Sequence, residues 1–239
     1  MAKELHITQL YINEMNTYGD RGNLLALTQR IKWRGYTPVI DYYHIGGTLP
    51  KQVDIVLGGG GQDAAQAEIQ SDIQRIRGRL TELTESDTPM LLICGTYQLF
   101  AHRFLTNANE EVKGISIFDA ETIGGDKRLI GNIAVETEDF GTLYGFENHS
   151  GRTYLHGTQQ ALGTVSRGNG NNGEDKTEGA RTNNVIGCYM HGPVLPGNPQ
   201  LNDWLIETAA INAHGEYAPQ VVDDTLAMLV RTGAANRKY

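Results

Sequence analysis

The feature that most constrains the fold is an alternation, through the first half of the chain, of short apolar runs with amphipathic stretches of helical length. Four runs have the composition of strands, at 5–12, 37–45, 53–60 and 89–94. Helical spacing of apolar residues follows at 22–35 and 64–86, and a third helix is expected to begin near Gly95. This order predicts a three-layer α/β fold, in which a mostly parallel, twisted sheet has helices on both faces.

The second half is predicted to be richer in strands. Strand-like runs joined by glycine turns span 114–123, 129–138, 141–155 and 185–192, and a closing helix is expected over 198–215. Residues 166–184 are polar and glycine-rich, which is typical of a hairpin tip or a mobile surface loop rather than of a domain linker. A length of 239 residues suits one large domain. We therefore expect a single domain over 1–239.

Composition argues against several classes of partner. The chain has 28 acidic and 20 basic residues, a net charge of -8, and no basic cluster, so neither nucleic acid nor an anionic membrane is expected to bind. The N-terminal residues lack the pattern of a signal peptide, and the apolar runs are too short for direct membrane insertion. Two cysteines are too few for a disulfide framework. We expect reduced thiols and a cytoplasmic protein.

One of the cysteines, Cys94, ends the apolar run PMLLIC and is followed by Gly95 and Thr96. A strand that turns sharply into a helix presents such a residue at the carboxyl edge of the sheet, where α/β proteins bind ligands. The N-terminus of the following helix favours a thiolate. A cysteine after an apolar strand can also be a buried packing residue, but the glycine turn behind Cys94 favours a nucleophile.

Four consecutive glycines, residues 58–61, follow the apolar run VDIVL in the segment LGGGGQD. Glycine lets the backbone approach a ligand and turn its N–H groups inward. The amides of Gly60 and Gly95 are therefore predicted to form an oxyanion hole, in which each donor is worth about 3 kcal/mol of transition-state stabilisation. The alternative is a merely flexible connection. The segment lacks the Lys-Ser/Thr of a phosphate-binding loop.

His191, in the segment GCYMHGP, is the predicted general base. It is expected to end a strand, and a base for Cys94 should come from a neighbouring strand end that is distant in sequence. Taken singly, it could be a solvated loop histidine. A zinc site that pairs His191 with Cys188 is not expected, because residues three apart in a strand point to opposite faces. Cys188 is predicted to pack in the core, and no metal site is expected.

Several segments together carry a family resemblance. The segments ICGTYQ, LGGGGQD, GFENHSG and YMHGPVLPGNP resemble the class I glutamine amidotransferases of the cobyric-acid-synthase-like branch. YGDRGNLLAL and KRLIGN are similar, within that branch, to the glutaminase subunits of lipid II isoglutaminyl synthases. The resemblance covers nearly the entire chain, and the ordered set of motifs is more specific than any one of them.

The resemblance implies roles for individual residues. Cys94 and His191 correspond to the nucleophile and the general base, and Gly60 and Gly95 fall where the family builds its oxyanion hole. The substrate-binding positions of the family match Gln98 and Arg128, whose guanidinium can grip a carboxylate at two points.

One departure from the family pattern concerns the acid that orients the histidine. Ordinary members carry His-x-Glu, whereas the corresponding position here is Pro193. The acid must therefore come from elsewhere in the chain or from a partner subunit. Glu147 and His149 are candidates for supporting polar roles.

For the whole chain, the resemblance implies the glutaminase subunit of a heterodimeric amidotransferase. The chain would hydrolyse L-glutamine through a cysteine thioester and pass ammonia to a Mur-ligase-like synthase subunit. That partner would hold ATP and Mg²⁺ and convert the D-glutamate of lipid II to D-isoglutamine in peptidoglycan synthesis. Three alternatives stay open: a glutaminase for another synthase with a cobyrinic-acid-like acceptor, a DJ-1-like cysteine hydrolase, and a non-catalytic binding module.

Overall fold

The first of two sheets is the predicted parallel one. In this computed structural model, which describes residues 3–236, its order is β11-β12-β4-β3-β1-β2. All neighbours are parallel except β11, which is antiparallel to β12. The strands are β1 (Glu4–Leu10), β2 (Thr37–Tyr43), β3 (Ile55–Gly58), β4 (Met90–Ile93), β11 (Ala180–Thr182) and β12 (Val185–Cys188). Every residue of β3, β4 and β12 is buried, as expected for central parallel strands.

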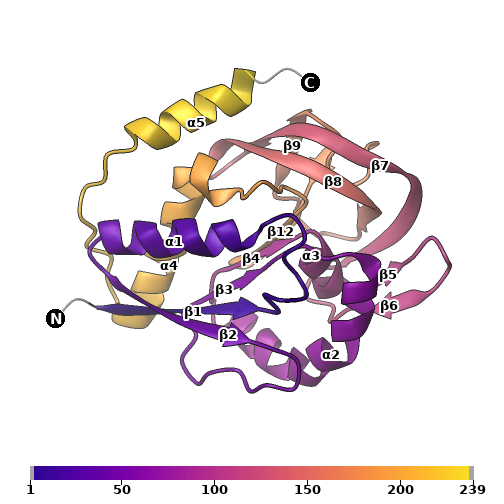
Figure 1. The fold of residues 1–239 in the computed structure, drawn as a ribbon, viewed down its shortest axis with the longest axis horizontal. Helices are drawn as coiled ribbons and strands as arrows, with labels where there is room; N and C mark the ends of the chain where they lie inside the picture. The colour runs from indigo at the N-terminus through magenta and orange to yellow at the C-terminus, as the bar shows by residue number, and fades with distance from the viewer. Residues whose placement is uncertain (1–2, 237–239) are drawn as a thin grey trace.

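Helices cover both faces of this sheet, which confirms the predicted three-layer α/β class (Figure 1). From β1 the chain passes through α1 to β2, at one edge of the sheet. From β3 it passes through α2 to β4, in the direction of the other edge. Because such crossovers are right-handed, the two helices lie on opposite faces. The direction reverses between β1 and β3, which creates the crevice where α/β proteins bind ligands. The helices of this region are α1 (Arg21–Trp33), α2 (Asp63–Glu85), α3 (Gly95–Phe100) and α4 (Pro199–His214).

The second half of the chain forms a separate sheet, which the sequence did not distinguish from the first. Its order is β10-β9-β7-β5-β6, and β8 also pairs with β7. Its strands are β5 (Arg103–Leu105), β6 (Glu111–Lys113), β7 (Ala120–Thr137), β8 (Gly141–Leu155), β9 (Gly163–Arg167) and β10 (Thr177–Glu178). The long antiparallel ribbon of β7 and β8 is prominent in Figure 1. A bridge between Phe146 of β8 and His191 links this ribbon to the chain that leaves β12.

Several local predictions need correction. The strand expected over 114–123 begins only at Ala120, and β12 ends at Cys188, before His191. The predicted closing helix is α4, but a further helix, α5 (Thr225–Asn236), follows it. A short 3₁₀ helix, η1 (Leu195–Gly197), precedes α4. The three-residue strands β5 and β6 were missed because so short a run carries no reliable periodicity.

The 166–184 segment is more ordered than a surface loop. It contains β10, which pairs with β9 in an antiparallel hairpin, and β11, which pairs with β12 of the other sheet. Asn171, Asn172 and Glu178 are buried, so part of this polar segment lies inside the molecule. Polar side chains can be buried there because the hairpin satisfies them, for example through the bond from the Asn171 amide to the carbonyl of Gly179 (2.9 Å).

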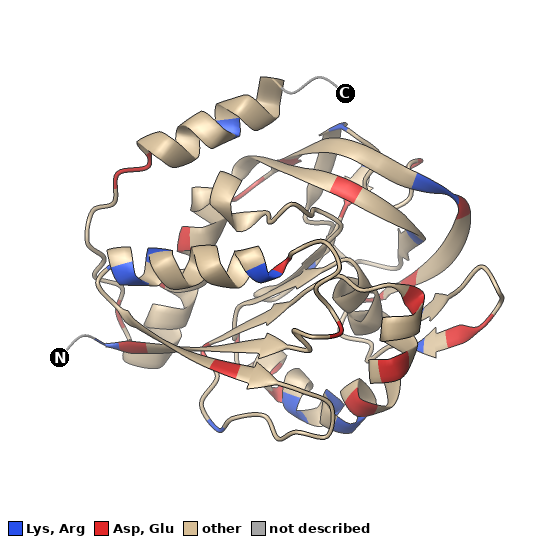
Figure 2. Cartoon of the chain, viewed as in Figure 1, with Lys and Arg blue, Asp and Glu red and all other residues tan. Residues whose placement is uncertain are grey.

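Two further observations concern the distribution of charged residues and the search for membrane-spanning helices. Figure 2 shows Lys and Arg on several helices and strands, interspersed with Asp and Glu. Within residues 3–236, no helix has both the length and the apolar character needed to cross a membrane.

Candidate active site

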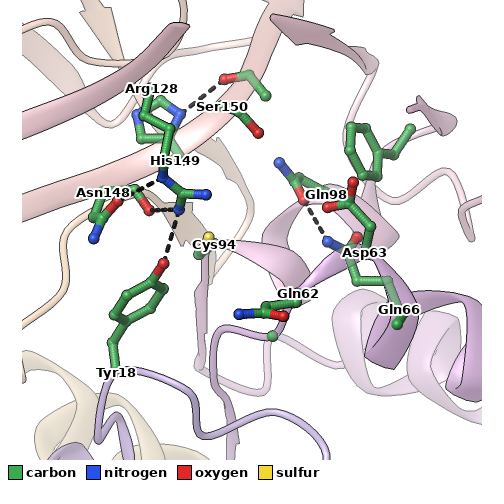
Figure 3. A pocket seen from close by; sticks show the side chains of 14 residues that line it. Tyr18, Gln62, Asp63, Gln66, Cys94, Gln98, Arg128, Asn148, His149 and Ser150 are labelled. Carbon is green, nitrogen blue, oxygen red and sulfur yellow. Dashed lines mark hydrogen bonds between the residues drawn. The ribbon is translucent and has the colours of Figure 1, made fainter. Parts of the chain in front are cut away.

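Cys94 lies on a sharp turn between β4 and α3. Its backbone has φ 51° and ψ -108°, a conformation that residues other than glycine rarely adopt. Its N–H donates to the carbonyl of Cys188 at 2.8 Å, and α3 begins at the next residue. A strained strand-to-helix turn of this kind is the geometry of a nucleophile elbow. Figure 3 shows the sulfur of Cys94 at the base of a pocket.

The glycine loop after β3 meets both Cys94 and His191. A Cβ atom added to Gly60 would lie 2.7 Å from Cε1 of His191 and 3.2 Å from Cβ of Cys94. The first separation is shorter than real Cβ contacts, so only glycine fits between the two side chains. The three segments singled out in the sequence therefore converge at one point.

The amides of this loop are not equivalent. The N–H of Gly60 donates to Oδ2 of Asp20 at 2.8 Å, so it is already occupied. The N–H groups of Gly61 and Gly95 have no protein acceptor among residues 3–236. These two residues are adjacent, because a Cβ on Gly95 would lie 3.1 Å from the nitrogen of Gly61. The amides left for an oxyanion are those of Gly61 and Gly95, a shift of one residue from the expected Gly60.

Neighbouring residues hold both the backbone and the ring of His191 in place. Its backbone exchanges two hydrogen bonds with Phe146, at 2.7 and 3.1 Å, and its ring packs 4.4 Å from the ring of Tyr18. Nδ1 lies 3.3 and 3.4 Å from the two carboxylate oxygens of Asp20. Burial opposes protonation of the imidazole, but its electrostatic and hydrogen-bond interactions with Cys94 and Asp20 outweigh this effect and raise the pKa of His191 to about 10. A proton accepted by His191 is therefore well stabilised.

Asp20 is the functional candidate that the sequence did not reveal. It lies in the segment YGDRGNLLAL, which supports the family resemblance, but no spacing connects residue 20 with residue 191. The one available signal was the position of an acid in the β1–α1 connection, directly before α1, because such connections lie at the sheet edge where α/β proteins bind ligands.

Arg128 lies on the opposite wall of the pocket, where a bulge in β7 places it. The pairing of β7 with β8 jumps from Gly124 opposite Gly151 to Leu129 opposite His149, so residues 125–128 of β7 bulge opposite the single residue 150 of β8. The guanidinium donates to Oδ1 of Asn148 at 2.9 Å and to the hydroxyl of Tyr18 at 2.8 Å (Figure 3). Its Nη1 has no protein partner among residues 3–236 and is free for a ligand.

The pocket between these walls has a volume of about 360 Å³, which suits a small molecule. Its lining is mostly polar and comes from both sheets. The lining residues are Tyr18, Gly61, Gln62, Asp63, Ala64, Gln66, Cys94, Gln98, Phe104, Arg128, Asn148, His149, Ser150 and Gly151.

Two further residues named from the sequence, Gln98 and His149, line the pocket. Gln98 lines the pocket but is held at both ends, since Oε1 accepts from Gln66 and Nε2 donates to the hydroxyl of Tyr189, each at 2.9 Å. His149 also lines the pocket, stacked 3.6 Å from the Tyr189 ring. Burial lowers its pKa to about 3, so it is neutral, and Nδ1 donates to the carbonyl of Gly151.

Glu147 does not line the pocket, and its side chain instead binds the loop between β9 and β10. Its carboxylate accepts the N–H groups of Asn169 and Gly170, at 2.8 and 2.9 Å. Cys188 packs in the core and is 1% exposed. Within the described part of the chain, no group of three or more His, Cys, Asp or Glu side chains is arranged to hold a metal ion.

Two solved structures share this fold. A chain in the structure of PurLQS from Thermotoga maritima aligns with a TM-score of 0.59 over 86% of this chain and 98% of its own length, at 11% identity. A second structure, described as a glutamine amidotransferase, aligns with a TM-score of 0.60 over 85% of this chain and 98% of its own length, at 14% identity. At such low identity the likeness supports the fold alone.

Sequence comparisons are more specific. The lipid II isoglutaminyl synthase (glutamine-hydrolyzing) subunit GatD of Staphylococcus aureus is 39% identical over 92% of this chain and 90% of its own. The subunit of that name from Streptococcus pneumoniae is 37% identical over 89% of this chain and 83% of its own. A cobyric acid synthase of Nocardia farcinica is 30% identical over 67% of this chain but only 31% of the synthase. Residues 6–199 match the model of the CobB/CobQ-like glutamine amidotransferase domain. The chain belongs to this family of glutamine amidotransferases.

Proposed function

We propose that this chain is the glutaminase subunit of a two-subunit amidotransferase and hydrolyses L-glutamine through a thioester on Cys94. The observation that carries the proposal is the meeting of Cys94, His191 and the glycine loop at the edge of a pocket whose far wall presents Arg128. A nucleophile, a base, free amide donors and a carboxylate-binding cation are the groups that acyl transfer from glutamine requires.

In the first half of the reaction, His191 takes the proton of Cys94, and the thiolate attacks the side-chain carboxamide carbon of glutamine. The amides of Gly61 and Gly95 receive the oxyanion, because both lack a protein acceptor. The carbon–nitrogen bond then breaks, and the imidazolium gives its proton to the leaving nitrogen, which departs as ammonia. A γ-glutamyl thioester remains on Cys94.

In the second half, water replaces ammonia beside His191. The imidazole takes a proton from the water as it attacks the thioester, the carbon–sulfur bond breaks, and glutamate is released with Cys94 restored. Throughout, the free Nη1 of Arg128 binds the α-carboxylate of the substrate. Gln98 and His149 form the wall beside it.

The acceptor of the ammonia is assigned through the relatives. Two relatives that align over most of the chain are named as the GatD subunit of lipid II isoglutaminyl synthase, which supports the same role here. In this proposal a Mur-ligase-like partner holds ATP and Mg²⁺ in the cytoplasm, activates the α-carboxylate of D-glutamate in lipid II, and combines it with ammonia to form D-isoglutamine. The cobyric acid synthases match over only a third of their length, which favours the lipid II acceptor.

The Cys94→Ala variant tests the proposal. In the purified complex with its synthase partner, we expect ammonia release from glutamine to fall by about 1,000-fold or more, because the covalent route is lost. Mass spectrometry of the wild-type complex should also find a diazo-ketone analogue of glutamine attached to Cys94.

Cys188→Ala is the matched control, since it removes the other thiol, which is buried in the core. That variant should keep its glutaminase activity. Normal ammonia release by the Cys94→Ala complex would overturn the proposed function. Labelling of Cys188 in place of Cys94 would do the same.

A further inference from the structure

A buried carboxylate at the start of α1 faces the imidazole of His191. Asp20 is 3% exposed and His191 is 2% exposed. The carboxylate oxygens lie 3.3 and 3.4 Å from Nδ1 of the ring. Burying a carboxylate is unfavourable unless it is paired or hydrogen-bonded. The placement of two buried ionisable groups against each other therefore points to a role beyond packing.

Asp20 occupies the N-cap position of α1 but does not cap the helix. An aspartate at this position usually accepts a hydrogen bond from one of the first free N–H groups of the helix. The side chain of Asp20 makes no such bond, and Oδ1 of Asn16 instead accepts the N–H of Arg21 at 2.9 Å. The carboxylate of Asp20 turns toward the site and accepts the N–H of Gly60 at 2.8 Å. It thus contacts two of the three converging loops.

We infer that Asp20 is the positioning acid of the Cys94–His191 pair, an inference that rests on the proposed function. A carboxylate can only accept a hydrogen bond, so it holds the proton of neutral His191 on Nδ1. Nε2 then keeps the lone pair that receives the proton of Cys94. Once His191 is an imidazolium, the carboxylate stabilises its charge.

The acid comes from the β1–α1 connection rather than from the position two residues after the histidine, which is Pro193. The ring of His191 is enclosed by this chain, because the Tyr18 ring packs against it. The backbone of His191 is also hydrogen-bonded to the backbone of Phe146. An acid from a partner subunit would find no exposed ring nitrogen to reach. The present separations exceed those of strong hydrogen bonds, and catalytic hydrogen bonds commonly shorten when substrate binds.

The titratable groups near His191 come from several elements. Asp20 precedes α1, Cys94 follows β4, and Tyr18 packs on the ring. His149 of β8 and Glu178 of β10 interact with His191 electrostatically. Burial opposes a charged imidazole, and Cys94 and Asp20 together raise its pKa to about 10. Removal of the Asp20 charge should therefore lower the pKa of His191.

Asp20→Asn in the full complex is the test. The substitution preserves the shape of the side chain, but the new amide can donate to Nδ1 and move the proton of His191 to Nε2. We expect kcat for glutamine hydrolysis to fall by about 100-fold or more, with little change in KM. In ¹⁵N NMR spectra of the full-length chain, the pKa of His191 should fall and its neutral tautomer should change from Nδ1–H to Nε2–H.

Asp72→Asn is the matched control. Asp72 of α2 is another buried aspartate, whose carboxylate accepts the hydroxyls of Tyr11 and Tyr43 at 2.9 and 2.8 Å and does not line the pocket. Its amide variant should lose stability but retain kcat and the wild-type His191 signals. A loss of kcat in Asp20→Asn together with these signals unchanged would indicate a merely structural role and overturn the inference.

Near-normal kcat in Asp20→Asn would also overturn it. If that variant does not fold, the wild-type spectrum decides, because an Nε2–H tautomer of neutral His191 in the native chain contradicts the inference. The Cys94→Ala complex separates the two proposals. An inactive Cys94→Ala beside a fully active Asp20→Asn removes Asp20 and leaves the glutaminase function standing.

Discussion

Arg128, the proposed carboxylate-binding residue, is held in place before any ligand arrives. Its guanidinium is held in one plane by Asn148 and by the hydroxyl of Tyr18, at 2.9 and 2.8 Å. Because these bonds restrict the side chain in the free protein, less conformational entropy is lost on binding. A lysine in its place would offer a single charged group on a flexible stem, without the two-point geometry of a guanidinium.

We therefore expect Arg128→Lys to raise KM for glutamine by about 10-fold to 100-fold, the range for loss of a charged hydrogen bond, while kcat is largely kept. Steady-state ammonia release by the complex measures both constants. Arg77→Lys, at an exposed arginine of α2, is the control and should match the wild type. A KM for Arg128→Lys equal to that of the control would remove Arg128 from the substrate site.

At the scale of elements, the β9–β10 hairpin has an unusual interior. Glu178 of β10 is fully buried, and its carboxyl accepts the N–H of Tyr189 at 2.6 Å, directly behind the pocket wall. Burial raises the pKa of Glu178 from 4.5 to about 8, and the charge of Glu147 acts in the same direction. The hairpin is therefore most stable when this side chain carries its proton.

Stability should consequently depend on pH through Glu178. Between pH 4.5 and about 8 the unfolded chain loses this proton while the folded chain keeps it, so the free energy of unfolding falls as pH rises. The slope from one such group is at most about 1.4 kcal/mol per pH unit. Denaturant unfolding at pH 6 and pH 8 should show a smaller decrease for Glu178→Gln than for the wild type.

Glu174→Gln is the control, because Glu174 is exposed in the same hairpin. It should retain the pH dependence of the wild type. Equal decreases between pH 6 and pH 8 in the wild type and both variants would show that Glu178 is ionised in the folded chain.

At the scale of the whole molecule, ion pairs around the buried Arg30 connect α1 with the C-terminal part of the chain. Arg30 of α1 donates to Asp203 of α4 at 2.7 Å and to Asp224, just before α5, at 2.6 Å. Its side chain is 5% exposed. Arg34 bonds Asp203 as well, so each partner in the network has more than one contact. Removal of Arg30 leaves the half-buried carboxylate of Asp224 without its arginine partner and leaves Asp203 with Arg34 alone.

We expect Arg30→Gln to lower the free energy of unfolding by about 2 kcal/mol, since the variant loses charged hydrogen bonds of a buried arginine to two half-buried carboxylates. Arg79→Gln is the control, because the Arg79–Glu82 pair is largely exposed and such pairs contribute less than about 1 kcal/mol. Urea titrations of both variants measure the difference. Equal midpoints would mean that the network contributes little to the fold.

Local patterns made much of this protein predictable. Periodicity within each segment indicated the strands, the first helices and the α/β class, because burial of one face or both leaves a repeat in the sequence. Short motifs singled out Cys94, the glycine loop and His191, since a tight turn or a close backbone approach restricts the residue types at adjacent positions. These features depend on neighbours along the chain.

Contacts between distant segments had to come from the tertiary structure. The separation into two sheets, the pairing of Asp20 with His191 and the occupation of the Gly60 amide all join residues far apart in sequence. Neither residue 20 nor residue 191 carries a local sign of the other, because an ion pair constrains position in space and leaves no periodic pattern. The sequence by itself thus determined most of the longer elements and the candidate reactive groups, whereas three-dimensional packing decided which acid faces His191 and which amides remain free.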